Sequence, residues 1–398
     1  MNKASTWILV LIAYSLAGPA TTAASGSLPH EARVLHAAGW DAAYRTDYDK
    51  ARAKFGELQK LVPNHPIGDM SLACIIWQDY LFRTRRLLSN TYHKESSFYS
   101  GVGSEGDSVD PQVDAQFQEL ISRALRNAQV QVDLNPRDPQ ALYFLGAIYG
   151  VRAAYEASAQ RRFWAALRDG LRSVKLHQEV IDIDPKVYDA YLTIGTYHYV
   201  VGSIPQPFRA IATMAGIHGG RRKGIAELES AMFNGIFNRN DARTILIALY
   251  RYEGSPQRSL IEVQALSALY PENPLLRLET ASTLIQLHRM PEATALFEDL
   301  LAGSDHRLDD LVHYQFAEAL AQNRAYAAAA NHFAAVELAS QAYPPLVAQA
   351  LLRAGQMYDL AGNRAEAIRM YRASLTRTES GDQRKIAERL IRQPFTGN

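Results

Sequence analysis

The sequence has a single cysteine, no excess of charge and only one long apolar run, which is at its start. The lone Cys74 excludes an intramolecular disulfide, and we expect it to be a small buried residue, with a reactive thiol as the alternative. Lys plus Arg number 42 against 41 Asp plus Glu, and a net charge of +1 creates no field that would attract nucleic acid. After the N-terminus, no segment approaches the roughly 20 apolar residues of a membrane helix. We therefore expect no nucleic-acid partner and no membrane span once a leader is removed.

Residues 1–24 follow the order of a secretory signal peptide. A positively charged start precedes an apolar run from Trp7 to Ala17, which ends at Gly18-Pro19 before a stretch of small residues. Cleavage is expected after Ala24, with Ala23 as the near alternative and an uncleaved anchor as a second one. We expect a protein that is secreted across the inner membrane into the periplasm.

In the rest of the sequence, prolines recur at a constant distance from a small residue that follows them. In four places the separation is 10 residues, and small and bulky residues recur at fixed positions before each proline. The pairs are Pro63 with Ala73, Pro136 with Gly146, Pro185 with Gly195, and Pro271 with Ala281. The pattern resembles the second helix of a tetratricopeptide repeat. The resemblance implies an all-α fold, a right-handed α-solenoid of about eight helical hairpins.

The first and last units match this repeat over their full length. In the first unit, Gly39 lets the paired helices approach closely and Phe55 fills the space between them. The last unit has Gly355 and Tyr371 at the equivalent positions. Both ends of the repeat array are therefore predicted from the same small and aromatic positions.

Three hairpins in the N-terminal half are predicted to be enlarged. The second contains a Gly-, Ser- and Asp-rich stretch at 96–111 that indicates a loop. The third is expected to have longer helices, and the fourth carries an insert at 203–223 that predicts a short amphipathic helix. We expect a signal peptide over 1–24, enlarged units over 25–238, regular units over 239–381, and a polar capping helix with a tail over 382–398.

The spacing of the candidate enzyme motifs argues against each of them. Gly101, Gly103 and Gly106 form a GxGxxG pattern, but no strand precedes it, so a dinucleotide would find no crevice between strand and helix. His30 and His36 are six residues apart rather than four, and they cannot share one helical face as zinc ligands do. We expect no catalytic residue, no cofactor and no metal.

The first helices of successive repeats line the inner wall of such a solenoid, and here the N-terminal part of that wall is aromatic. We predict that it binds a partner, because aromatic side chains supply contact area at a small cost in entropy. The predicted binding residues are His36, Trp40, Trp77, Tyr143 and Tyr199. A scaffold would expose Trp40 and Trp77. The alternative is that the enlarged hairpins bury these side chains as core.

A compact basic turn precedes one of the later helices. We predict that its glycine amides, together with His218, Arg221 and Arg222, form a possible binding site for phosphate or carboxylate. A solvated basic turn with no ligand is the alternative.

Two further resemblances concern function. Gly202-Ser-Ile-Pro-Gln-Pro-Phe-Arg and Gly216-Ile-His-Gly-Gly-Arg-Arg-Lys-Gly-Ile-Ala-Glu-Leu resemble the middle of the tetratricopeptide repeat protein 39 family, whose fungal members act in inclusion-body clearance. The match covers residues 190–255, and Gly220 stands where that family has an acidic residue. The overall plan is similar to the periplasmic repeat component of tripartite substrate-transport systems. Both resemblances imply binding or scaffolding.

We therefore predict a periplasmic scaffold that binds a protein or peptide partner in its concave groove. The alternative is a transport-associated binder of an apolar or anionic small molecule, held in a pocket that the insert from Pro205 to Gly220 would enclose. Enzymatic activity is not expected.

Overall fold

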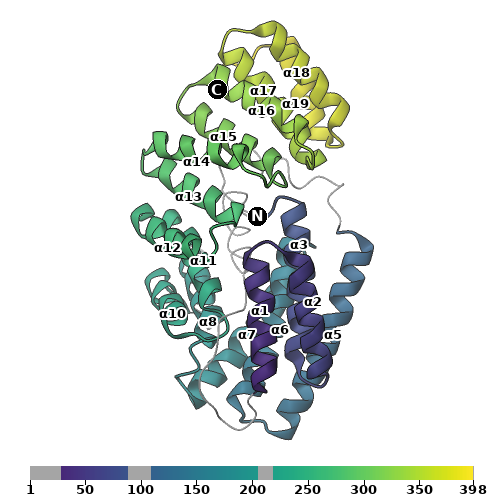
Figure 1. The fold of residues 1–398 in the computed structure, drawn as a ribbon, viewed down its shortest axis with the longest axis vertical. Helices are drawn as coiled ribbons and strands as arrows, with labels where there is room; N and C mark the ends of the chain where they lie inside the picture. Colours follow the sequence, from purple (N-terminus) through teal and green to yellow (C-terminus); the bar gives the residue numbers. More distant parts are fainter. Residues whose placement is uncertain (1–27, 88–108, 205–217, 398) are drawn as a thin grey trace. The chain divides into compact units, whose positions relative to one another are not determined.

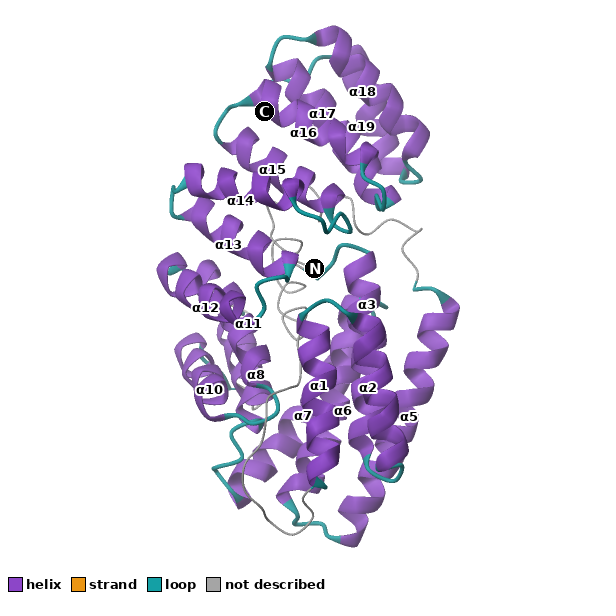
Figure 2. Ribbon diagram, in the orientation of Figure 1, coloured by secondary structure: helices purple, strands orange, loops and turns teal. Residues whose placement is uncertain are grey.

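The computed structural model describes residues 28–87, 109–204 and 218–397. These residues form α-helices joined by short loops, with one 3-10 turn and no strand among them (Figure 2). They divide into two units. The first unit comprises residues 28–81 with the described part of 109–273, and the second comprises 82–87 with 274–397.

The first unit contains five consecutive hairpins (Figure 1). They are α1 (His30–Tyr44) with α2 (Tyr48–Leu61), α3 (Pro66–Arg83) with α5 (Pro111–Leu134), α6 (Pro139–Ser158) with α7 (Phe163–Ile183), α8 (Ala190–Gly202) with α10 (Arg221–Asn234), and α11 (Arg239–Tyr252) with α12 (Pro256–Leu269). The last two residues of α3, Phe82 and Arg83, belong to the second unit.

The second unit contains three hairpins and a final helix. They are α13 (Pro274–Gln286) with α14 (Met290–Ala302), α15 (Asp309–Gln322) with α16 (Tyr326–Ala335) and the 3-10 turn η4 (Val336–Leu338), α17 (Pro344–Leu360) with α18 (Arg364–Arg377), and then α19 (Gly381–Arg392). With the five hairpins of the first unit, the described residues confirm the predicted all-α solenoid of about eight hairpins.

Local sequence explains where many of these helices begin. The carboxylate of Asp110 accepts a hydrogen bond from the backbone N of Gln112 at 2.7 Å, and Asp138 does the same for Gln140 at 2.9 Å. Both caps are followed by a proline at the start of the helix, where the missing N–H costs nothing. Pro111 therefore marks the start of α5, and Pro139 marks the start of α6.

In several hairpins the two helices meet where the first helix has a glycine and therefore no side chain. A Cβ atom on Gly39 would lie 2.3 Å from Cε1 of Phe55, and one on Gly355 would lie 2.4 Å from Cε1 of Tyr371. The aromatic ring thus occupies the space that the glycine leaves, as the repeat signature predicted. In the fourth hairpin two glycines meet, and a Cβ on Gly224 would lie 2.4 Å from the carbonyl oxygen of Gly195.

The third hairpin is enlarged through longer helices, as predicted: α6 has 20 residues and α7 has 21. The predicted signal peptide, most of the loop at 96–111 and the centre of the insert at 203–223 lie outside the described residues. The two units divide at Asn273. The boundary predicted at 238/239 marks a different division, from enlarged to regular hairpins.

The end of the second unit is closed by α19 and the residues after it. This helix packs on α18 and buries Ala387 and Leu390, while its charged residues face outward. The backbone N of Phe395 then donates to Oδ2 of Asp359 on α17 at 2.8 Å. The segment predicted to be a polar cap therefore covers the last hairpin, as terminal repeats must to protect their apolar side.

We predict that Gly224→Ala destabilises the first unit by about 1–3 kcal/mol, because the new methyl group overlaps backbone atoms of α8 that cannot rotate away. The matched control is Gly56→Ala in the middle of α2, where a Cβ meets nothing within 4 Å. That change should stabilise the helix by about 0.5–1 kcal/mol. Urea unfolding followed by tryptophan fluorescence measures both. Equal effects of the two substitutions would contradict the close helix contact.

Candidate functional site

The aromatic side chains that were predicted to form an open groove are buried in the first unit. Their exposed fractions are at most 3%, and Trp77 is fully buried. The set is His36 on α1, Trp40 on α1, Trp77 on α3, Tyr143 on α6 and Tyr199 on α8. The expectation that Trp40 and Trp77 are exposed is therefore wrong. Both side chains belong to the core, which was the alternative prediction. A role for them in binding stays a prediction.

One aromatic side chain from a loop fills the space between these residues. Phe237, between α10 and α11, lies with its ring centroid 5.8 Å from that of His36 and 6.1 Å from that of Tyr143. The Phe144 ring is 5.9 Å away. Phe237, a residue of the same unit, thus packs against side chains of α1 and α6. No position of the repeat signature indicates this contact.

Asp189 holds this loop in place. Its Oδ1 accepts hydrogen bonds from the backbone N of Phe237 at 2.7 Å and of Asn238 at 3.0 Å. In return, the side-chain amide of Asn238 donates to the carbonyl oxygen of Asp189 at 2.7 Å. Burial raises the pKa of Asp189, and the backbone N–H donors act in the opposite direction. The loop is consequently fixed by several hydrogen bonds at one buried carboxyl group.

The first and fifth hairpins of the first unit also contact each other. The Tyr44 hydroxyl donates to Oδ1 of Asp241 on α11 at 2.6 Å, and its ring stacks on Tyr270 with centroids 5.0 Å apart. The amide of Asn273 donates to the carbonyl oxygen of Tyr44 at 2.7 Å. These contacts join residues some two hundred positions apart in sequence, and they connect the two ends of the first unit's series of hairpins.

Titratable groups inside the first unit have strongly shifted pKa values, and the cause is burial. Desolvation lowers the pKa of His36 to about 3 and those of His65 and His177 to about 4. Burial also raises the pKa of Cys74, which is fully buried as predicted. Shifted pKa values can mark functional sites when charge partners in a cleft cause them. Here the first cause is the packed interior, so the shifts describe a core.

The basic turn before α10 is solvent-exposed, and carboxylates lie close to it. His218, Arg221 and Arg222 are all exposed. Nη1 of Arg221 pairs with Oε1 of Glu253 at 3.1 Å, and Lys223 lies 3.8 Å from Glu227. Carboxylates therefore offset part of the positive charge that was expected to attract an anion. Binding of phosphate or carboxylate at this turn stays a prediction.

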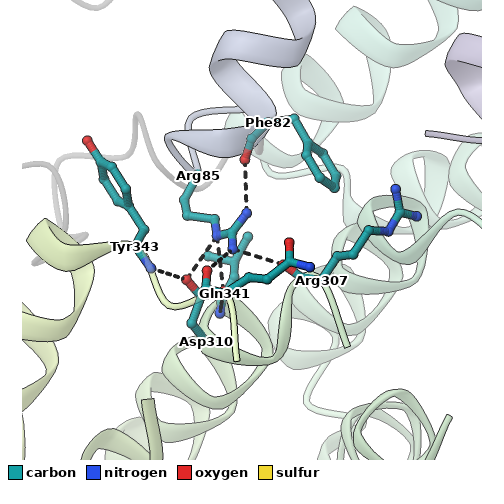
Figure 3. Close-up of polar contacts among 7 residues, drawn as sticks. Phe82, Arg85, Arg307, Asp310, Gln341 and Tyr343 are labelled. Atoms are coloured by element: carbon teal, nitrogen blue, oxygen red, sulfur yellow. Dashed lines mark hydrogen bonds and ion pairs between the residues drawn. The ribbon is translucent and has the colours of Figure 1, made fainter. Parts of the chain in front are cut away.

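Sequence reasoning missed a buried ion pair in the second unit (Figure 3). Nε of Arg85, just after α3, lies 2.9 Å from Oδ2 of Asp310 on α15, and the side chains are only 4% and 0% exposed. Nη2 of Arg85 also donates to the carbonyl oxygens of Arg307 at 2.9 Å and Gln341 at 2.8 Å. Asp310 accepts in addition from the backbone N of Tyr343 at 2.9 Å. The short segment after α3 is thereby fixed to a loop and a helix more than two hundred residues later.

A row of partly buried polar side chains crosses the first helices of the second unit. We call it the polar face, and it consists of Ser282 on α13, Gln315 and Glu318 on α15, and Arg353 and Gln356 on α17. Nε of Arg353 donates to Oε1 of Glu318 at 3.1 Å, and Nη1 donates to Oε1 of Gln356 at 2.9 Å. The Ser282 hydroxyl lies 3.4 Å from Oε1 of Gln315. Hydrogen bonds thus connect neighbouring hairpins along this face.

Within residues 28–87, 109–204 and 218–397, no three His, Cys, Asp or Glu side chains are grouped as metal ligands would be. In the same ranges, no helix has the length and apolar character required to span a bilayer.

No family model matches the sequence, and no curated protein matches it. Among solved structures, yeast Tom70 is 11% identical, with 91% of each chain covered and a TM-score of 0.40. A tetratricopeptide repeat protein of Thermus thermophilus is 17% identical over 64% of this chain and 99% of that one, with a TM-score of 0.34. One from Parabacteroides merdae is 11% identical over 81% and 100%, with a TM-score of 0.35. At these TM-scores the likeness carries no argument about function, and the resemblance to the tetratricopeptide repeat protein 39 family is not confirmed.

The buried histidines predict a pH dependence of stability in the first unit. His36, His65 and His177 stay neutral in the folded chain down to about pH 4, whereas in the unfolded chain they titrate near the ordinary value of 6.5. Between these values the unfolded chain binds more protons, so the free energy of unfolding should fall as pH falls from 7 to 5.5. His177→Gln should make this slope shallower by close to one proton.

The measurement is urea unfolding at several pH values with tryptophan fluorescence as the signal. The described tryptophans, Trp40, Trp77 and Trp164, all lie in the first unit and therefore report on it. A wild-type slope of zero over this range would show that the histidines are not buried as described.

We predict that Arg85→Met destabilises the second unit by about 3–5 kcal/mol, because it leaves the buried carboxylate of Asp310 without its counter-charge. Hydrogen exchange over α15 and the loop at 339–343 measures the loss. Asp382→Asn serves as control, since its partner Lys385 is 80% exposed and such surface pairs contribute little. Unchanged exchange rates in Arg85→Met would contradict a structural role for the ion pair.

Proposed function

We propose that the protein is a non-enzymatic interaction scaffold whose second unit binds an extended polar segment of a partner protein on the polar face. The observation that carries this proposal is the row of hydrogen-bonding side chains across three successive hairpins. Such a row offers donors and acceptors at regular intervals along one direction. A partner segment lying across the hairpins would meet one polar group at each repeat.

Arg353 is the side chain on which we expect such a segment to depend most. It is 19% exposed, it reaches both Glu318 and Gln356, and its guanidinium lies 5.4 Å from the ring centroid of Phe333. Its position is thus fixed before a partner arrives, which lowers the entropy lost on binding. A planar guanidinium also presents several donors in a defined geometry, suited to a partner's carboxylate or carbonyl groups.

Binding is favoured over catalysis because of where the side chains with shifted pKa values lie. The histidines, tyrosines and Cys74 with the largest pKa shifts owe them first to burial, most of them in the first unit and His332 and Tyr371 in the second. The polar face instead combines partly buried groups already engaged with one another. This arrangement supports recognition of a segment by hydrogen bonds.

We propose further that the scaffold acts after secretion across the inner membrane, in the periplasm, on the basis of the signal-peptide order of residues 1–24. Mass spectrometry of the protein from its own cells tests this. A mass that begins at residue 25 would support secretion, and an intact Met1 in a cytoplasmic fraction would contradict it.

The other candidate, a transport-associated binder of a small molecule, requires the insert from Pro205 to Gly220. Most of that insert lies outside the described residues. No described contact favours this function over a scaffold.

Site-specific photo-cross-linking tests the scaffold function. A photoreactive amino acid at Gln315 or Gln356, both half-exposed on first helices, should cross-link the same partner protein in the native cells. Matched control positions are Ala328 on α16 and Arg372 on α18, exposed residues on the second helices of the same hairpins. Arg353→Ala should reduce the cross-link by about tenfold, the loss of roughly one charge-assisted hydrogen bond. Identical products from all four positions would contradict the proposal.

A further inference from the structure

A depression lies between the first two hairpins of the first unit, apart from the polar face. Its walls come from the end of α2, the turn after it, the start of α3 and the middle of α5, helices that neighbour one another in Figure 1. Its volume is about 450 Å³, within the range typical of small-molecule sites. The proposed scaffold function does not use it.

The base of the depression is a buried carboxylate that is already neutralised. Asp69 on α3 is 3% exposed. Its Oδ1 accepts from Nε2 of Gln59 at 2.5 Å, and from Nε and Nη2 of Arg123 at 3.1 and 2.8 Å. The remaining Arg123 nitrogen, Nη1, donates to Glu119 at 2.6 Å. Asp69 is thus held in place and its charge is offset within the wall.

Two further cations on the rim have no such carboxylate. Lys60 near the end of α2 and Arg126 on α5 both line the depression and are both exposed. No ion pair to either is found among the described residues, whereas nearby Lys54 pairs with Glu57 at 3.0 Å. The amide of Asn127, also in the wall, donates to the carbonyl oxygen of Pro63 at 3.3 Å. Two positive charges from two different hairpins therefore face one hollow.

We propose that this depression binds a small dianion whose oxyanion groups, phosphate or carboxylate, are held by Lys60 and Arg126. The guanidinium of Arg126 supplies paired donors that fit an oxyanion, and the ammonium of Lys60 supplies a second charge. Asp69 does not repel the ligand because Arg123 and Gln59 already occupy it. Arg123 is shared between Asp69 and Glu119, so Lys60 and Arg126 are the two positive charges of the lining that remain for the two negative charges of the ligand.

Isothermal titration calorimetry of the full chain with inorganic phosphate and with succinate, at constant ionic strength, tests the proposal. We expect saturable binding to one site by at least one of the two, and the one that binds identifies the ligand chemistry. Lys60→Gln and Arg126→Gln should each weaken it by about tenfold, the effect of one charge-assisted hydrogen bond. Both side chains are exposed, so circular dichroism should show an unchanged fold.

The control variant is Arg372→Gln, an exposed cation on α18 of the second unit, which should bind as the wild type does. Arg222→Gln, in the basic turn before α10, tests the other candidate site for an anion. Three results would overturn the proposal: no saturable binding of either compound, unchanged affinity in both Lys60→Gln and Arg126→Gln, or a loss confined to Arg222→Gln. The last would assign the anion to the basic turn instead.

Discussion

The structure depends on close approach of the two helices within several of its hairpins, at positions where one helix has a glycine and so lacks a side chain. At Gly39 and Gly355 the vacant position receives an aromatic ring, and at Gly224 it receives backbone. Because protein interiors are packed without spare volume, these few positions fix how the paired helices cross.

The first helices of the hairpins differ between the two units in how exposed their side chains are. In the first unit, Phe237 packs among His36 and Tyr143 of these helices. Asp189 holds the loop that carries Phe237. In the second unit the equivalent helices carry partly buried polar groups joined across hairpins by Arg353. Aromatic content alone therefore did not identify an open surface. We propose the polar face as the place where a partner binds, because its side chains are partly accessible whereas the aromatic ones are not.

The repeat, the hairpin boundaries and the tight positions could all be predicted from sequence, because each rests on local spacing between a small residue, an aromatic and a proline. Contacts between distant segments could not. Nothing near Phe237 in sequence indicates that its ring covers His36, and nothing near Arg85 indicates that Asp310 is its partner. Such pairings are set by how the hairpins stack, and a single sequence contains no record of them. The depression at Lys60 and Arg126 is hidden for the same reason.

The aromatic residues predicted to line a groove of the first unit form core instead. Iodide quenching of tryptophan fluorescence in a Trp7→Phe/Trp164→Phe variant tests this most directly, because only Trp40 and Trp77 then emit. Both are at most 2% exposed, so we predict emission at short wavelength with little quenching until the protein unfolds. Quenching as strong as that of free tryptophan in the folded protein would contradict the account and restore the open groove.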